Sequence, residues 1–299
     1  MPYLPEAVES VRAQTFRDFE LVVQDGASTD ATLEYFGSLD GIPGLDVLSE
    51  ADGGIGDAYA RALRRCRGEL VGSIDADNLL EPDALARVVA VFRERPELAC
   101  LYGAVRTIDA DGTVIGTFTP EPFDLVRVMS CELVPPFSTA YFSRRACGDE
   151  LRVDERMTTC ADYELWLRLG CLPIARTTDV LGSTRLSEAS MSRRTEEYDV
   201  HCANKRAALR RYLDVQPRTA LIDALQRRSE AGIWLWAAES VFNVEGRSER
   251  FERYVAAAAD LVSDAPRLDA ARALGREPPP STTVLEKPPV RRAPWRLRH

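Results

Sequence analysis

The chain has 299 residues, which is enough for one large domain or for one domain with an appendage. Hydrophobic residues make up 45% of it and charged residues 28%, so its composition excludes a largely disordered, collagen-like or fibrous protein. The 38 Lys and Arg residues are outnumbered by 47 Asp and Glu residues, and the formal net charge of −9 argues against nucleic acid as a partner.

The sequence lacks the signals of a membrane-spanning or exported protein. No stretch reaches the roughly 18–20 consecutive apolar residues that a membrane span needs, and no basic segment followed by an apolar run opens the chain. The seven cysteines are odd in number and scattered, which disfavours a disulfide framework or a structural zinc site and suits a reducing compartment. We therefore expect a cytoplasmic protein.

Apolar periodicity predicts alternating helices and strands over the first hundred residues. The helical stripe of Leu4, Val8 and Val11 predicts a helix at the start of the chain. The elements predicted after it are a strand at 19–23, a helix carrying Leu33 and Phe36, a strand at 45–48, a helix at 55–66, a strand at 70–74 and a helix from about 84 to 92. These alternations predict an α/β fold with a mostly parallel sheet flanked by helices, whose ligands bind beyond the carboxyl ends of the strands.

From residue 98 the pattern changes. Two apolar runs, 98–105 and 113–118, flank an Asp-Gly turn, which predicts an antiparallel hairpin. Further strands are predicted at 137–142 and 173–180, with a helix from about residue 162 between them. After residue 198 the periodicity is helical.

We expect three parts: an α/β domain over residues 1–195, a helical C-terminal region over 196–275 and a disordered, Pro- and Arg-rich tail over 276–299. Trp234, Trp236 and Phe242 could shape an acceptor surface, but aromatic stripes on helices are more often core, which is the interpretation we favour. The basic tail could touch anionic lipid at the inner face of a membrane, although a solvated tail is the simpler explanation.

The most specific local signal is Asp75-Ala76-Asp77, which directly follows the apolar run 70–74 and precedes a helix. Two carboxylates in a tight loop at the carboxyl end of a strand can hold a hard divalent cation, which can bridge a diphosphate that the acidic loop alone would repel. A polar turn with a helix-capping Asp is the alternative. Asp109-Ala110-Asp111 has the same spacing, but it leads into Gly112 within a hairpin and is expected to be only a turn.

Two more acidic loops follow predicted strands. In the loop at 24–30, Asp25 can accept a hydrogen bond from a base N–H, whereas Asp30 is expected to cap the next helix. The loop at 49–58 carries Asp52 and Asp57 among several glycines. Each loop alone is a weak signal, but their order along the chain is specific.

Taken in order, the acidic loop at 25–30, the S-E-x-D-G-G-I-x-D-A sequence at 49–58 and the G-E-L-V-x-S-I-D-A-D sequence at 68–77 closely resemble the family 2 glycosyltransferases of the GT-A fold. Those enzymes transfer a sugar from a nucleotide diphosphate sugar. The P-F-S-T-A-Y-F-S-R-R sequence at 136–145 and the A-D-Y-E-L-W-L-R-L sequence at 161–169 agree with the resemblance, which covers about residues 2–195. It implies a GT-A, Rossmann-like domain with a C-terminal helical appendage.

The resemblance implies roles in donor binding for five carboxylates. Asp25 would contact the nucleobase, and Asp52 and Asp57 would help to form the nucleotide pocket. Asp75 would lie near the ribose and the metal. Asp77 would be the direct ligand of that divalent cation, Mn²⁺ or Mg²⁺.

Asp162, which opens the predicted helix at 162–169, matches the catalytic base of the family. It would take the proton from an acceptor hydroxyl as that oxygen attacks the anomeric carbon, so that one displacement inverts the centre. The alternative is a helix N-cap, since the apolar residues that follow are expected to be buried. The other motifs favour the catalytic interpretation.

The sequence also departs from the family pattern. Arg185-Leu186-Ser187 has Ser where many relatives have a His that can complete a metal site, and Gly26 replaces a second acidic residue found in many members. Relatives carry a hydrophobic strand before the segment that matches residues 2–8. We therefore expect a gap in the sheet beside the strand at 20–23, caused either by a start assigned too far downstream or by a real truncation.

The resemblance thus implies an inverting, metal-dependent glycosyltransferase that acts in the synthesis of a cell-surface polysaccharide or glycan. Because Asp25 suits a pyrimidine N–H, a UDP- or dTDP-sugar is favoured as donor, with a glycan or lipid-linked acceptor. A sugar-nucleotide pyrophosphorylase would need a glycine-rich, basic phosphate loop near the N-terminus, which the sequence lacks. A catalytically silent nucleotide-sugar binding or scaffolding protein is the remaining alternative, and the sequence indicates no oligomeric state.

Overall fold

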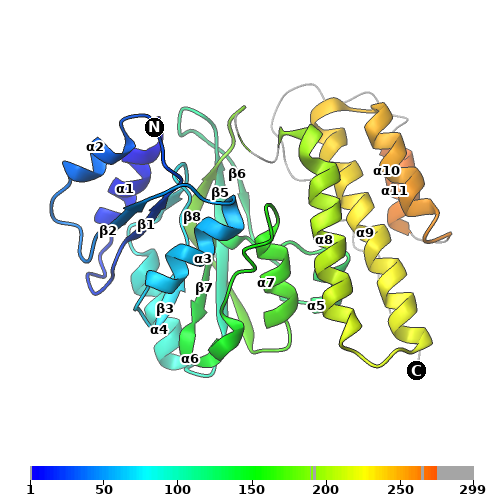
Figure 1. Ribbon diagram of the computed structural model, residues 1–299, viewed down its shortest axis with the longest axis horizontal. Coiled ribbons are helices and arrows are strands. Elements are labelled where there is room, and N and C mark those ends of the chain that lie inside the picture. Colours follow the sequence, from blue (N-terminus) through cyan, green and yellow to red (C-terminus); the bar gives the residue numbers. More distant parts are fainter. Residues whose placement is uncertain (1, 189, 191–192, 264–265, 275–299) are drawn as a thin grey trace. The chain divides into compact units, whose positions relative to one another are not determined.

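The structure is a computed structural model that describes residues 2–188, 190, 193–263 and 266–274. The chain divides into two compact units (Figure 1). The first contains residues up to 128 and residues 133–187, and the second contains residues 129–132 and the chain from residue 188 onward. The tail expected at 276–299 lies outside the described residues.

The first unit is built around a six-stranded sheet. Its strands lie in the order β3 (Leu70–Gly72), β7 (Ala140–Ser143), β5 (Cys100–Ile108), β8 (Ile174–Arg185) and β4 (Leu79–Leu80), and β6 (Val114–Phe118) pairs with β5 beside this path. Among these described strands only β5 and β8 pair in parallel, and the other pairs are antiparallel. The α/β class is therefore confirmed, but the prediction of a mostly parallel sheet is wrong. Its strands after residue 98 pair mainly as hairpins and returning strands, which the early βα pattern could not anticipate.

The first two strands form a separate parallel sheet. β1 (Val22–Asp25) pairs with β2 (Asp46–Ser49) in a register that places Val23 opposite Val47, and α2 (Thr32–Gly37) connects them. No backbone ladder joins β1 to β3 among the described residues.

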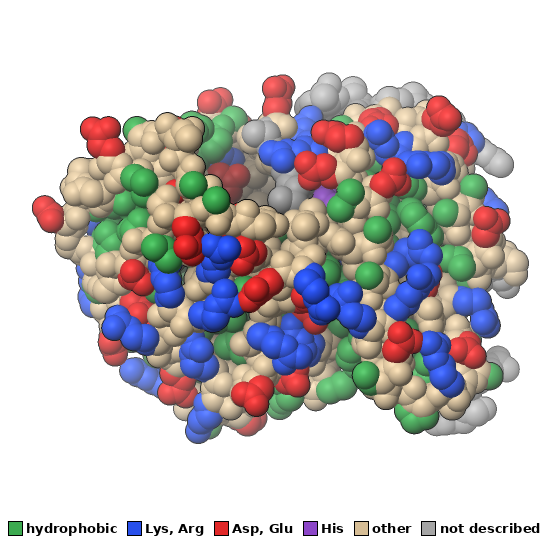
Figure 2. All heavy atoms as spheres, viewed as in Figure 1, with side chains coloured by type: hydrophobic (Ala, Val, Ile, Leu, Met, Phe, Trp, Pro, Cys, Tyr) green, Lys and Arg blue, Asp and Glu red, His purple; other side chains and the backbone are tan. Residues whose placement is uncertain are grey.

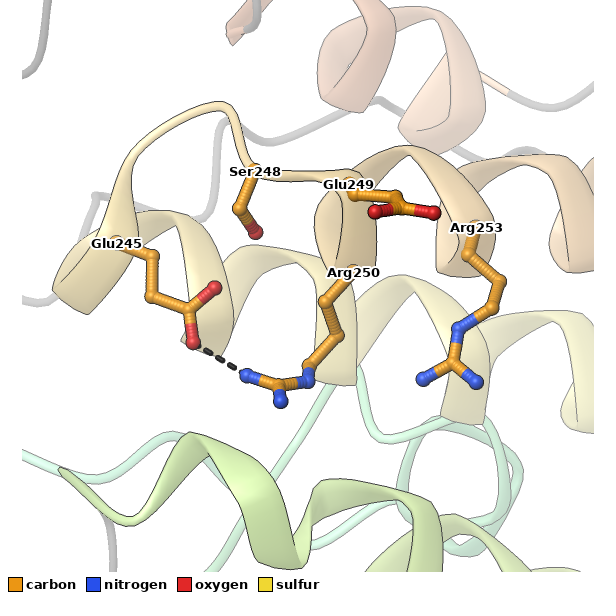
Figure 3. Close-up of a pocket in the computed structure, with 5 residues that line it drawn as sticks. All are labelled: Glu245, Ser248, Glu249, Arg250 and Arg253. Atoms are coloured by element: carbon orange, nitrogen blue, oxygen red, sulfur yellow. Dashed lines mark hydrogen bonds and ion pairs between the residues drawn. The ribbon is translucent and has the colours of Figure 1, made fainter.

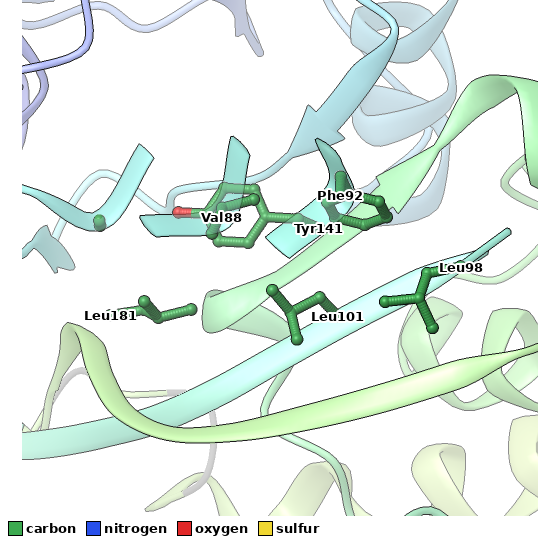
Figure 4. Packing of buried hydrophobic residues seen from close by; sticks show 7 residues of the cluster. Val88, Phe92, Leu98, Leu101, Tyr141 and Leu181 are labelled. Atoms are coloured by element: carbon green, nitrogen blue, oxygen red, sulfur yellow. The ribbon is translucent and has the colours of Figure 1, made fainter. Parts of the chain in front are cut away.

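One face of the large sheet is covered by α4 (Ala84–Glu94). Val88 and Phe92 of this helix pack against Leu101 of β5 and Tyr141 of β7, and all four side chains are buried (Figure 4). Burying aliphatic and aromatic side chains of this size contributes about 1.5–3 kcal/mol each. The helix therefore fixes the positions of the central strands.

The opposite face is covered by α7 (Ala161–Leu169). Trp166 of this helix lies 6.0 Å from Tyr102 and 5.6 Å from Phe142, measured between ring centroids. These two residues directly follow Leu101 and Tyr141, and successive side chains of a strand point to opposite faces. The alternation along β5 and β7 thus places α4 and α7 on opposite sides of the sheet.

A second, smaller core holds the β1–β2 sheet. Val8 of α1 (Leu4–Arg12), Phe36 of α2 and Ile42 form its buried centre. The side chain of Gln14 connects α1 to the large sheet, because it donates to the carbonyl of Glu81 at 2.7 Å and accepts from the N–H of Leu85 at 3.1 Å. Side-chain hydrogen bonds thus link the two cores.

The helix α3 (Ile55–Arg65) joins β2 to β3. Arg65 in its last turn donates to the carbonyl of Val23 at 2.7 Å and to that of Asp46 at 3.0 Å, which attaches the helix to both strands of the small sheet. The shorter elements of this part of the chain are the helices α5 (Leu125–Met129) and α6 (Arg144–Cys147) and the 3₁₀ turns at Phe137–Thr139 and Gly148–Glu150.

The turn between β5 and β6 tests the interpretation of the second D-x-D sequence. A carboxylate oxygen of Asp109 accepts from the N–H of Asp111 at 3.0 Å and of Thr113 at 2.9 Å. Gly112 has a φ of +84°, which a residue without a Cβ adopts readily. Asp109-Ala110-Asp111 is therefore a hairpin turn, as expected.

The described part of the second unit is helical, with a 3₁₀ turn at Thr195–Glu197 and the helices α8 (Tyr198–Asp214), α9 (Ala220–Glu245), α10 (Glu249–Ala259) and α11 (Pro266–Leu274). On α9, Trp234 stacks on Tyr254 at 5.5 Å, and Phe242 lies 5.5 Å from Phe251. These contacts place the aromatic stripe of α9 in the packing between helices rather than on an acceptor surface. None of the helices described is both long and apolar enough to cross a bilayer.

We predict that Gly56→Ala destabilises the first unit. A Cβ at this position would lie 2.3 Å from the carbonyl oxygen of Met157 and 3.0 Å from that of Asp154, so the backbone of the loop before α7 would have to move. Overpacking of this kind costs about 1–3 kcal/mol. Thermal unfolding should show a lower melting temperature than wild type.

Gly37→Ala is the matched control, because a Cβ added to Gly37 of α2 would meet nothing within 4 Å. It should leave the melting temperature within experimental error of wild type or slightly above it. Equal melting temperatures for Gly56→Ala and wild type would contradict the close approach of the loop to α3.

Candidate functional site

The predicted site residues follow the carboxyl ends of three strands. Asp25 is the last residue of β1, Asp52 and Asp57 follow β2, and Asp75 and Asp77 follow β3. Ligands of α/β sheets bind at these ends.

Asp25 is 7% exposed and is held by two serines. Its Oδ2 accepts from the N–H of Ser28 at 2.9 Å and from the hydroxyl of Ser49 at 2.5 Å. Burial alone would raise the pKa of this carboxyl, but the hydrogen bonds from Ser28 and Ser49 outweigh it and lower the pKa below its ordinary value of 3.8. Asp25 is therefore an anion at neutral pH, and its Oδ1 takes part in neither of these two bonds.

Asp52 lies against the loop that follows Asp25. A Cβ added to Gly26 would come within 2.9 Å of Oδ2 of Asp52, so a larger residue at position 26 would displace the carboxylate. The other oxygen of Asp52 accepts from the N–H of Gly54 at 2.9 Å. The structure thus brings Asp25 and Asp52 together, as the resemblance implies.

Asp57, in the first turn of α3, is fully engaged by its own surroundings. It accepts from Nε of Arg61 at 2.9 Å and from the N–H of Gly53 at 2.9 Å, and Arg61 also forms an ion pair with Glu50 at 2.9 Å. The hydrogen bond from Arg61 is the main reason why the pKa of Asp57 is lowered. Asp57 thereby fixes the loop that carries Asp52.

Asp75 is held by a tyrosine and an asparagine. Its Oδ1 accepts from the hydroxyl of Tyr59 at 2.5 Å, and its Oδ2 accepts from the amide of Asn78 at 3.0 Å. Part of the residue is open to solvent, and protein surrounds much of the carboxylate. Desolvation by this protein raises the pKa of Asp75, and the negative charges of Asp77 and Asp162 raise it further against the hydrogen bond from Tyr59.

Asp77 is half-buried on the same loop. Burial raises its pKa, whereas its own backbone N–H and the positive charge of Arg185 act in the opposite direction. Because Asp77 also acts on the charge of Asp75, the two carboxylates of the D-A-D sequence face one region of the site.

Asp162 lies in the first turn of α7 and is not its N-cap. The N-cap is Cys160, a non-glycine residue with a φ of +58°, which is a strained backbone conformation. Asp162 makes no hydrogen bond or ion pair with any other described residue, but its charge acts on both Asp75 and Tyr59. The helix-capping alternative for Asp162 is therefore wrong.

These carboxylates can supply only some of the ligands that a divalent cation needs. Asp75, Asp77 and Asp162 supply hard oxygen ligands and a surplus of negative charge, and among the described residues no basic side chain is a cause of the pKa shift of Asp75. Within the described residues, however, no three acidic, His or Cys side chains are arranged to hold a metal ion. Magnesium-like ions commonly take one or two carboxylates and complete their shell with water and substrate phosphates, so the donor set suits an ion held jointly with a diphosphate.

The buried side chain of Arg185 anchors the D-A-D loop. Its guanidinium donates to the carbonyl of Asp77 at 3.2 Å, to that of Ala110 at 3.0 Å and to the carboxylate of Glu6 at 2.7 Å. It also lies 4.3 Å from the centre of the Tyr3 ring.

Three contact residues of the site were not predicted from the sequence, and two of them, Tyr59 and Arg185, have partners that are distant along the chain. They are Tyr59 and Asn78, which hold Asp75, and Arg185, whose N–H donates to Oδ1 of Asn78 at 3.1 Å. The position of Asn78 directly after Asp77 was the one available signal.

Two hollows of the surface lie away from these carboxylates. One, of about 380 Å³, is lined by Glu245, Ser248, Glu249, Arg250 and Arg253 at the junction of α9 and α10, where Arg250 pairs with Glu245 (Figure 3). The other, of about 580 Å³, lies between α1 and β4. The side chains of Arg253, Glu6 and Glu81 around these hollows already pair with opposite charges, so neither hollow offers unbalanced charge to a ligand.

The surrounding surface is balanced in charge. Figure 2 shows Lys and Arg side chains intermixed with Asp and Glu side chains over the face in view. Such pairs screen each other. Asp75 differs, because burial and then the negative charges of Asp77 and Asp162 raise its pKa.

We predict that Arg185→Lys lowers the free energy of unfolding by about 1–3 kcal/mol, because an ammonium group cannot bond the separate carbonyls that the guanidinium reaches. Denaturant unfolding should show the loss. Arg87→Lys is the control, since Arg87 is 44% exposed and pairs with Asp83 on the surface at 2.7 Å, where the change should stay within about 0.5 kcal/mol. Equal losses in the two variants would contradict the anchoring role of Arg185.

The chain is similar in sequence to known proteins over its first unit. Residues 1–130 match the family model "Glycosyl transferase family 2". The chain is 33% identical over 172 residues to chondroitin synthase of Escherichia coli, covering 56% of this chain and 24% of that protein. It is 31% identical over 170 residues to hyaluronan synthase of Pasteurella multocida, covering 56% of this chain and 17% of that protein. The chain thus spans about a quarter or less of the length of these relatives.

Solved structures share the fold. TarS of S. aureus, residues 1–349, superposes with a TM-score of 0.60 at 20% identity, covering 91% of this chain and 84% of that one, and it has also been solved in complex with UDP-GlcNAc. The mannosyltransferase PcManGT from Pyrobaculum calidifontis, in complex with GDP-Man and Mn²⁺, gives a TM-score of 0.53 at 18% identity, covering 92% of this chain and 76% of that one.

Proposed function

We propose that this chain, whose residues 1–130 match the family 2 glycosyltransferases and whose fold resembles that of TarS, transfers a sugar from a nucleotide diphosphate sugar to an acceptor hydroxyl with inversion. The observation that carries the proposal is the position of Asp25, Asp52 and Asp75 after successive strands, together with the effect of the charges of Asp77 and Asp162 on Asp75. The names of the polysaccharide synthases similar to this chain support a role in polysaccharide or glycan synthesis. The reaction would take place in the cytoplasm, with any membrane contact made by the basic residues after 276.

In this proposal Asp25 recognises the base. Its Oδ2 is held by Ser28 and Ser49, which leaves Oδ1 to accept from the N–H of a uracil or thymine ring. The UDP-GlcNAc complex of TarS supports a UDP-sugar as donor. Because PcManGT was solved with GDP-Man, the test below includes GDP-sugars. Asp52, beside Gly26, would close the same pocket.

Asp77 would hold the diphosphate side of the donor through a divalent cation, with Asp75 next to it. When bound, Mn²⁺ or Mg²⁺ supplies positive charge that stabilises the departing nucleoside diphosphate. The half-buried position of Asp77 and the repulsion between the two carboxylates favour such a partner. The Mn²⁺ in the PcManGT complex supports a cation of this class.

Asp162 would act as the base. It is a carboxylate without a hydrogen-bond partner among the described residues, at the start of a helix anchored by the buried Trp166. In that position it can accept the proton of an acceptor hydroxyl as the oxygen attacks the anomeric carbon from the side opposite to the leaving group. One such displacement gives inversion.

The proposed function is tested by measuring the release of nucleoside diphosphate from UDP-, dTDP- and GDP-sugars, with Mn²⁺, Mg²⁺ or EDTA, in the presence of oligosaccharide acceptors. Transfer that stops with EDTA supports the proposal. Metal-dependent donor binding without turnover over a wide acceptor panel would favour a silent nucleotide-sugar binding protein, and pyrophosphate-dependent exchange would indicate a pyrophosphorylase.

We predict that Asp77→Ala weakens Mn²⁺-dependent binding of a UDP-sugar at least tenfold, because the diphosphate then faces Asp75 without a ligated cation between them. Isothermal titration calorimetry measures the affinity. Asp111→Ala is the matched control, since Asp111 belongs to the D-x-D sequence of the hairpin turn, and it should bind as wild type does. Unchanged affinity in Asp77→Ala would rule out the metal-ligand role.

We predict that Asp162→Asn keeps the donor affinity but lowers kcat by about 10²–10⁴-fold, since an amide can accept a hydrogen bond but cannot take up the proton. Steady-state kinetics at saturating acceptor separate the two quantities. Near wild-type turnover in this variant would contradict the assignment of Asp162 as the catalytic base.

A further inference from the structure

We propose that Tyr59 is a positioning residue for the donor half of this site, which acts by fixing the carboxylate of Asp75; this inference rests on the proposed function. Tyr59 lies on α3, between the loop that carries Asp52 and the strand that leads to Asp75. None of the motifs of the sequence analysis includes it.

The hydroxyl of Tyr59 interacts with one carboxylate assigned to donor binding and one assigned to catalysis. It donates to Oδ1 of Asp75 at 2.5 Å, and the charge of Asp162 acts on it. Burial, followed by the neighbouring charge of Asp75, raises the pKa of Tyr59 well above its ordinary value of 10.0, so the phenol keeps its proton and remains a donor.

The ring of Tyr59 is fixed independently of its hydroxyl. It packs edge-on against Phe137, with 5.6 Å between the ring centroids and an interplanar angle of 84°. Because this contact involves only the aromatic ring, a phenylalanine at position 59 retains it. Loss of the hydroxyl can therefore be separated from loss of the packing.

The two hydrogen bonds to Asp75 engage different oxygens of the carboxylate. Tyr59 on α3 engages Oδ1, and Asn78 on the loop after β3 engages Oδ2. Without the phenol, only Asn78 holds the carboxylate, and repulsion from Asp77 and Asp162 favours its rotation out of place. The two-point attachment thus orients Asp75 toward a donor molecule.

A neutral hydrogen-bond donor suits this position better than a positively charged side chain. Asp57 shows the contrast within the same helix, because Arg61 holds it with a positive charge and lowers its pKa. An arginine beside Asp75 would cancel the negative charge that attracts a cation. A phenol orients the carboxylate and leaves that charge in place.

The test is a double-mutant cycle on Tyr59→Phe and Asp75→Asn, with calorimetric binding of UDP in the presence of Mn²⁺ as the readout. Removing a hydrogen bond to a charged group corresponds to an affinity loss of about tenfold, so Tyr59→Phe should bind UDP about tenfold more weakly than wild type. In the Asp75→Asn background the same change should cause no further loss, since the carboxylate through which it acts is gone.

Tyr102→Phe is the matched control. Its buried hydroxyl also makes one hydrogen bond, at 2.7 Å to the carbonyl of Glu121, and it touches none of the carboxylates of the site. This variant should bind UDP as wild type does. Thermal unfolding of Tyr59→Phe should lie within a few degrees of wild type, which shows that the loss of affinity does not come from unfolding.

The outcomes separate the inference from the function on which it rests. If wild type binds UDP and Tyr59→Phe binds equally well, or if the tenfold loss persists in the Asp75→Asn background, the inference is overturned and the proposed function stands. If wild type binds none of UDP, dTDP and GDP with Mn²⁺, the proposed function and the inference both fall.

Discussion

The geometry of the first unit depends on the placement of one buried guanidinium. Arg185 is 2% exposed, and burial of its charge is tolerable only where each N–H finds an acceptor. Its acceptors come from three distant parts of the chain: Glu6 of the first helix, Asp77 of the acidic loop, and the turn at 109–110. The network is therefore complete only when the small core, the large sheet and the hairpin are assembled. Arg185 holds the D-A-D loop through the backbone carbonyl of Asp77, so this bond does not occupy the carboxylate of Asp77.

The charges of the two units are arranged on different principles. In the helical unit, Glu230 is 4% exposed and accepts from Arg206, Arg210 and Gln226, which bring its pKa down to about 2 although burial would raise it. That carboxylate is balanced and structural. At the ends of the strands of the first unit, burial raises the pKa of Asp75, and the negative charges of Asp77 and Asp162 raise it further. Charge repulsion that the fold leaves unrelieved is typical of sites completed by a ligand.

Local patterns predicted most helices and strands of the chain, because periodicity and turn residues act over a few positions. They also separated the two D-x-D sequences, since Asp109-Ala110-Asp111 leads into Gly112 of a hairpin turn. The direction of strand pairing was predicted wrongly, because it depends on partners that can lie far away along the chain, as for Leu70 and Ser143. Tyr59 and Arg185 were missed for the same reason: a phenol or a guanidinium acquires its role from acceptors that the sequence places 16 and 179 positions away.

The separation of the β1–β2 sheet from the large sheet affects how the chain opens. Side chains hold it in place, among them Arg65 on the carbonyl of Val23 and Glu20 on the N–H of Gly68, where a continuous sheet would have a ladder. Exposing the amides of β1 and β2 therefore requires breaking fewer cooperative bonds than opening the large sheet, and the two strands form a low-energy unit for hydrogen exchange. Asp25 lies on this unit. A nucleobase bound there would slow exchange across both strands, and part of the free energy of binding would go into the entropy lost by holding them still.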